Sequence, residues 1–153
     1  MIRAWIVFVL SLAGVYIVDQ NIKAIFLSGW QWESSCVSLV LVFNKGVAFS
    51  MFSFLGAYLK WIQIALLAGV LGYIIHAKIL QQYSFPLGLL FGAGISNIAD
   101  RFMHDGVVDY VYWHCGFEFA IFNFADTMIN LSVGWLILHS FGLIGVKNID
   151  KKL

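Results

Sequence analysis

Acidic residues and asparagines recur along this chain at the spacing of one helix face. Asp19 and Lys23 are four residues apart, so a helix would place both on the same face. The same rule joins two further groups: Asn97, Asp100 and Arg101, and Asn123, Asp126 and Asn130. Asp109 lies between these groups, in the segment HDGVVDYVYWH.

Such a set of residues could carry out acid–base chemistry. Two carboxyl groups that lie close together do not ionise equally easily, so one acid and one carboxylate coexist near neutral pH. That pair can activate a water molecule and protonate a leaving amine, which is the chemistry of aspartic peptidases. Each residue alone also has a structural explanation, for example Asn123 as a helix cap.

Other catalytic chemistries have less support. No serine stands in a G-x-S-x-G motif, and nothing in the spacing favours Ser50 with Lys45 or Lys60. The four histidines are scattered, and the sequence contains no H-E-x-x-H motif. We therefore expect no metal ion and no cofactor.

The composition is that of a membrane protein. Of the 153 residues, 61% are hydrophobic and only 11% are charged, which is far more apolar than a soluble domain. The net charge of +1, without any basic run, argues against nucleic-acid binding. The chain is long enough for one domain, which we assign to residues 1–153.

Charged residues divide the chain into apolar segments that predict four membrane-spanning helices. There are 17 residues between Lys60 and Lys78, 21 between Lys78 and Asp100, and 20 between Asp126 and Lys147. A spanning helix needs about 20 apolar residues. The first segment, residues 4–18, is shorter and must extend into residues 19–26. No signal-peptide cleavage site follows it, so we interpret it as a retained span.

The distribution of charges predicts the orientation. With four spans both termini lie on one side, and that side would hold five of the nine basic residues but only one acid, Asp150. We therefore expect cytoplasmic termini and an acid-rich outer face that includes residues 31–53 and 101–115.

Residues 37–43, VSLVLVF, are too short to span a membrane as a helix and are rich in β-branched residues. The turn cluster Asn44-Lys45-Gly46 follows, and then VAFSMF, which together predict a β-hairpin. The expected fold is therefore a membrane all-α protein with four transmembrane helices and a small extracytoplasmic β element between spans 1 and 2.

Small residues are expected to bring helices together. Gly88, Gly92 and Ser96 are four apart in span three, and Ala65/Gly69 and Ala68/Gly72 repeat this spacing in span two. The two cysteines, Cys36 and Cys115, form no CxxC motif, and we expect buried or free thiols rather than a disulfide.

Five stretches resemble, in order, the motifs of lipoprotein signal peptidase, also called signal peptidase II. They are DQNIK at 19–23, FNKGVAFS at 43–50, GAGISNIADR at 92–101, GVVDY at 106–110 and FNFAD at 122–126. The resemblance implies a bacterial inner-membrane aspartic endopeptidase that removes signal peptides from diacylglyceryl-modified prolipoproteins, its substrate partners. It implies no cofactor and an active site toward the outer face.

The same resemblance assigns roles to residues. Asp109 and Asp126 correspond to the catalytic aspartates. Residues expected to support this pair or to contact substrate are Asp19, Lys23, Asn44, Gly46, Asn97, Asp100, Arg101 and Asn123. Val47 and Ser96 depart from the family pattern, which usually has Ala and often has Gly there. Val47 adds bulk in a segment expected to lie against the substrate, and the effect of the two departures on the substrate groove stays open.

Two other classes of protein stay open at this point. An ion-coupled carrier also needs embedded acids, although its site tends to lie near the membrane midplane between internal repeats. A structural membrane subunit could use the same polar residues only to hold helices together.

Overall fold

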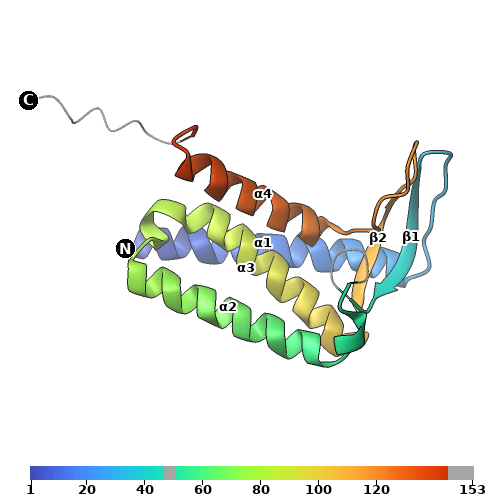
Figure 1. Cartoon of the computed structure of the whole chain (residues 1–153), viewed down its shortest axis with the longest axis horizontal. Helices are drawn as coiled ribbons and strands as arrows, with labels where there is room; N and C mark the ends of the chain where they lie inside the picture. Colours follow the sequence, from blue (N-terminus) through green and yellow to red (C-terminus); the bar gives the residue numbers. More distant parts are fainter. Residues whose placement is uncertain (47–50, 145–153) are drawn as a thin grey trace, which may run out of the picture.

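The computed structural model describes residues 1–46 and 51–144. Four long helices lie alongside one another, and two strands cross one end of them (Figure 1). The elements in chain order are α1 (Ile2–Leu27), β1 (Val37–Asn44), the 3-10 turn η2 (Ser53–Leu55), α2 (Tyr58–Ala77), α3 (Leu80–Met103), β2 (Val107–Trp113) and α4 (Phe124–Ser140). The N-terminus lies at the end opposite to the strands.

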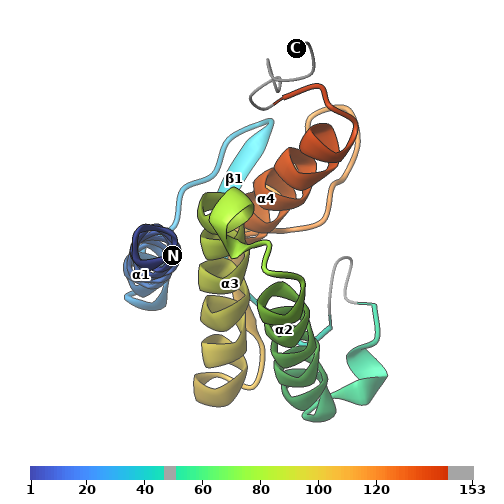
Figure 2. The same cartoon turned by 90° about the vertical axis from the view of Figure 1, so that its left-hand side faces the viewer.

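Helix α3 is the centre of the bundle. It contacts α1, α2 and α4, and Figure 2 shows it between them when the bundle is viewed end-on. Near the end opposite to the sheet, Phe8 of α1 and Ile74 of α2 pack with Leu87 and Phe91 of α3. Side chains on several faces of α3 can therefore contact neighbouring helices.

Two glycines allow α1 and α3 to approach closely, as the spacing in span three predicted. A Cβ atom at Gly88 would lie 2.6 Å from the carbonyl oxygen of Phe8, and one at Gly92 would lie 2.5 Å from that of Leu12. The corresponding prediction for span two is wrong at its glycines, because a Cβ at Gly69 or Gly72 would meet nothing within 4 Å among the described residues.

The predicted strand after the first helix is confirmed. Most of the second strand of the predicted hairpin, residues 47–52, lies outside the described residues. β1 pairs antiparallel with β2, which comes from the connection between α3 and α4, and Asn44 lies opposite Val107. Gly106 permits this approach, since a Cβ there would lie only 3.2 Å from the Asn44 carbonyl oxygen.

The two cysteines are joined, contrary to the sequence-based expectation. Cys36 directly precedes β1, Cys115 follows β2, and their sulfurs form a disulfide. They are separated by 79 residues in sequence, and only the pairing of the two strands brings them together. The disulfide closes the sheet at the end away from Asn44.

The described residues form four α-helices, the number predicted, but length and composition identify only two of these four as candidate membrane spans. These are α1 and α2, with 26 and 20 residues. Helix α4 has 17 residues and is about 26 Å long, slightly less than the apolar thickness of a bilayer. Helix α3 carries glutamines at one end and the Asn97 to Arg101 group at the other.

The close contact of α1 with α3 gives a stability prediction. Gly92→Ala places a methyl group against the backbone of Leu12, and overpacking of this kind costs about 1–3 kcal/mol. Gly72→Ala is the matched control, because its new methyl group meets open space and alanine favours a helix. We expect Gly92→Ala alone to lower the yield and the thermal midpoint of detergent-extracted protein. Equal midpoints for the two variants would contradict this packing.

Candidate active site

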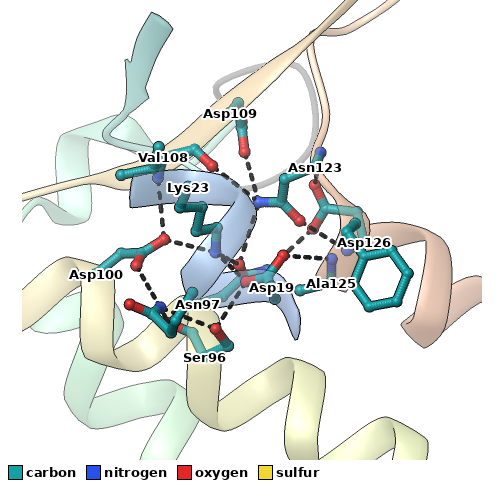
Figure 3. Close-up of polar contacts among 12 residues, drawn as sticks. Asp19, Lys23, Ser96, Asn97, Asp100, Val108, Asp109, Asn123, Ala125 and Asp126 are labelled. Atoms are coloured by element: carbon teal, nitrogen blue, oxygen red, sulfur yellow. Dashed lines mark hydrogen bonds and ion pairs between the residues drawn. The ribbon is translucent and has the colours of Figure 1, made fainter. Parts of the chain in front are cut away.

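A buried ammonium group joins α1 to α3 below the sheet (Figure 3). Lys23 Nζ lies 2.5 Å from Asp19 Oδ2, 2.6 Å from Asp100 Oδ2 and 2.9 Å from Asn97 Oδ1. The Lys23 side chain is 1% exposed. Its three N–H bonds therefore meet three oxygens, as a buried charge requires.

The two carboxylates around Lys23 each reach a further element. Asp19 accepts a hydrogen bond from the backbone N–H of Ala125 in α4 at 2.9 Å and another from Ser96 Oγ at 2.7 Å. Asp100 accepts one from the backbone N–H of Val108 in β2 at 3.1 Å. One ion cluster thus fixes α1, α3, α4 and β2 relative to one another.

Asn97 extends this cluster toward Asp126. Its side-chain oxygen accepts from Lys23, and its Nδ2 donates to Asp126 Oδ1 at 3.0 Å. Because the oxygen is occupied by an ammonium donor, the amide nitrogen must face the carboxylate, which fixes the orientation of the amide.

Asn123 connects the two aspartates of the proposed pair. It is the N-cap of α4: its Oδ1 accepts from the Asp126 backbone N–H at 2.8 Å, and its own N–H donates to Asp126 Oδ2 at 3.1 Å. Its Nδ2 donates to Asp109 Oδ1 at 2.8 Å. The alternatives of helix cap and site residue are therefore not exclusive, because Asn123 is both.

Asp109 lies in β2, and its carboxyl group is almost fully buried. Asn44 Nδ2 from β1 donates to its second oxygen, Oδ2, at 2.9 Å. Burial, followed by the nearby charge of Asp126, raises the pKa of Asp109 to about 7. Asp109 can therefore hold a proton near neutral pH, as a general acid must.

Both aspartates line a cavity of about 310 Å³. Its polar wall is formed by Asn44, Gly46, Gln63, Asn97, Arg101, Asp109, Asp126 and Asn130. Its apolar wall includes residues 119–122, which follow β2, and Ile129 of α4. A substrate entering this cavity would meet both carboxyl groups.

The structure brings all ten predicted site residues to one end of the bundle. Asp109, Asp126, Asn44, Gly46, Asn97 and Arg101 line the cavity, whereas Asp19, Lys23, Asp100 and Asn123 lie behind it. Arg101 Nη2 donates to the carbonyl oxygen of Gly46, which joins α3 to the end of β1.

Of the two departures from the family pattern, the structure describes Ser96. Ser96 does not line the described cavity, and its hydroxyl donates to Asp19 and accepts from Gln20 Nε2 at 2.9 Å. Ser96 therefore affects the ion cluster rather than the substrate groove. Val47 lies outside the described residues.

Sequence reasoning missed three contributors. Gln20 Nε2 donates to Asp100 Oδ1 at 2.8 Å, and Gln63 of α2 lines the cavity. Tyr110 stacks on Phe26 of α1 and accepts from the Phe124 backbone N–H, so it holds β2 against two helices. A carboxamide inside an apolar helix was a usable signal for Gln63, but the role of Tyr110 depends on strand pairing.

The bundle has the fold of solved bacterial membrane enzymes. Two solved bacterial membrane enzyme structures, at 2.3 Å and 1.9 Å resolution, superpose with TM-scores of 0.76 and 0.71. They are 23% and 24% identical in sequence, and they cover 95% and 92% of this chain and 93% and 94% of theirs.

Comparison of sequences is more specific. The profile of the signal peptidase II family matches residues 11–142, so the chain belongs to the signal peptidase II family. It is 54% identical to the lipoprotein signal peptidase of Sulfurovum sp., over 89% of this chain and 93% of the relative. It is 47% identical to that of Helicobacter pylori strain Shi470, over 91% and 89%.

Proposed function

We propose that Asp109 and Asp126 are the catalytic pair with which this inner-membrane signal peptidase removes signal peptides from lipoprotein precursors. The main support is the position of the two carboxyl groups at the wall of one cavity, where Asn123 donates a hydrogen bond to each of them. Membership of the family gives the class of reaction, and the geometry supports the assignment of the two residues.

The surroundings of the two carboxyl groups favour different roles. The raised pKa of Asp109 makes it the group that holds the proton. Asp126 is in the first turn of α4 and accepts hydrogen bonds from Asn97 and from the Asn123 backbone N–H. The helix N-terminus stabilises negative charge there. Asp126 is therefore the base and Asp109 the acid at the start of the reaction.

The reaction then has two steps, water attack and collapse of the intermediate, and each step needs two proton transfers. Asp126 takes a proton from water as the water oxygen bonds to the scissile carbonyl carbon, and Asp109 gives its proton to the carbonyl oxygen. The resulting diol collapses: the C–N bond breaks, Asp126 protonates the leaving nitrogen, and Asp109 recovers a proton from a diol hydroxyl. The pair returns to its starting protonation state, and neither group forms a covalent bond to substrate.

The substrate class follows from the surroundings of the cavity. Phe119, Ile121 and Phe122 form an apolar wall beside the carboxyl groups. Burying acyl chains contributes about 0.8 kcal/mol per CH₂ group, so a lipid attached near the scissile bond would add affinity. This supports a diacylglyceryl-modified precursor as the substrate.

We also propose that all four helices span the membrane and that the active site lies toward its outer face. The disulfide between Cys36 and Cys115 supports an oxidising, extracytoplasmic compartment for the sheet end. The start of α1, which contains Arg3, and the end of α2, which Lys78 caps, lie toward the opposite end (Figure 1), as the positive-inside rule predicts for a cytoplasmic face. The shorter α4 and the polar ends of α3 are compatible with spanning, because the ion cluster neutralises charges that lipid would otherwise meet.

The catalytic assignment is tested by removing one ionisable group at a time. Asp109→Asn and Asp126→Asn should each lower cleavage of a diacylglyceryl prolipoprotein by a factor of about 10³ or more. The double variant should be little worse, because the two groups act as one unit. Asp105→Asn is the matched control, since its side chain is 73% exposed and does not line the cavity. Substantial turnover by either single variant at normal folded yield would show that the assignment is wrong.

The topology is tested by labelling single introduced cysteines in intact cells. Lys45→Cys, at a side chain that is 67% exposed beside β1, should react with a membrane-impermeant maleimide. Gln81→Cys, exposed at the start of α3, should react only after permeabilisation. The reverse pattern would refute the proposed orientation.

A further inference from the structure

Two polar atoms at the cavity have no hydrogen-bond partner among the described residues. They are the side-chain oxygen of Gln63, Oε1, and the side-chain nitrogen of Arg101, Nε, and both atoms are buried. Both side chains line the cavity that contains Asp109 and Asp126. A buried acceptor or donor without a partner costs about 1–3 kcal/mol, so two at one cavity need an explanation.

Gln63 is not explained by helix packing. It lies in the segment WIQIAL of α2, where the adjacent residues are apolar. A glutamine inside a spanning helix commonly hydrogen-bonds to a neighbouring helix, but the Gln63 oxygen makes no such bond to α3 or to another described element. Its carboxamide oxygen is left for a group that enters the cavity.

Arg101 is held in place by one end of its guanidinium group. Nη2 donates to the carbonyl oxygen of Gly46, and the charges of Asp109, Asp100 and Asp126 favour the charged guanidinium. The side chain is 6% exposed overall. This anchoring leaves the Nε–H as a fixed donor at the cavity wall.

We propose that Gln63 binds the backbone of the signal peptide, with its Oε1 accepting from a substrate N–H while Arg101 Nε donates to a substrate carbonyl oxygen. One acceptor and one donor are free, and an extended peptide offers one of each at every residue. This inference rests on the proposed function, because the peptide must lie across the carboxyl pair. Recognition through the backbone would tolerate many side chains in the substrate.

In this proposal Gln63 binds and positions the substrate, so loss of its hydrogen-bond acceptor should lower kcat/KM. Gln63→Met keeps the size of the side chain but removes the acceptor. We expect kcat/KM for the lipid-modified precursor to fall about fivefold to tenfold, the usual effect of losing one neutral hydrogen bond. Ile62→Met is the matched control, because Ile62 precedes Gln63 in α2, is 50% exposed and does not line the cavity.

A substrate series separates backbone binding from a general structural role. Single ester bonds replace successive amide bonds of the precursor near the cleavage site, and each ester removes one N–H donor. We expect one ester position to lower kcat/KM in the wild-type enzyme by a similar factor. At that position Gln63→Met should cause no further loss, whereas it should still impair cleavage of all other substrates.

The outcomes distinguish the two proposals. If the wild-type enzyme does not cleave the modified precursor, the proposed function is wrong. If it does, then unchanged kinetics in Gln63→Met, or equal loss with every ester substrate, overturns the role of Gln63. Should Gln63→Met fold poorly, the ester series with wild-type enzyme decides alone, because cleavage of every ester at the rate of the amide also overturns it.

Discussion

The ammonium group of Lys23 is the interaction on which the rest of the site depends. It lies in the protein interior between two carboxylates and an amide oxygen, and each of these acceptors also bonds to another element. A buried charge that loses its partner costs about 3–5 kcal/mol, so the partners cannot separate. Gly88 and Gly92 allow α1 and α3 to come close enough for this contact.

The same cluster determines the geometry of the aspartate pair. Lys23 orients Asn97, and Asn97 donates to Asp126, while Asn123 bonds both Asp126 and Asp109. The side chains of Asp109 in β2 and Asp126 in α4 are thereby held in position, although neither forms a direct hydrogen bond or ion pair with Lys23. The burial that this arrangement imposes on Asp109 is also what raises its pKa, so positioning and acid–base tuning have one physical cause.

Much of the site could be predicted from the sequence because its residues follow helical spacing and ordered motifs. Asp19 with Lys23, and Asn97 with Asp100, share faces that local periodicity reveals. The pairing of β1 with β2 could not be predicted in this way, since it joins segments about 65 residues apart and competes with a plausible local hairpin. The disulfide was missed for the same reason. A carboxamide in an apolar helix was a signal for Gln63, but it does not reveal which cavity the side chain lines.

If Asp109 carries the proton of the pair at the start of the reaction, this proton can be observed by spectroscopy. Infrared difference spectra between about pH 5 and about pH 9 separate protonated carboxyl groups from carboxylates. We predict a buried carboxyl band in the wild-type protein that disappears as the pH rises, with a midpoint at a pH of about 7. This band should be absent from Asp109→Asn and retained in Asp105→Asn. A wild-type protein without such a band, or a band that persists in Asp109→Asn, would contradict the account.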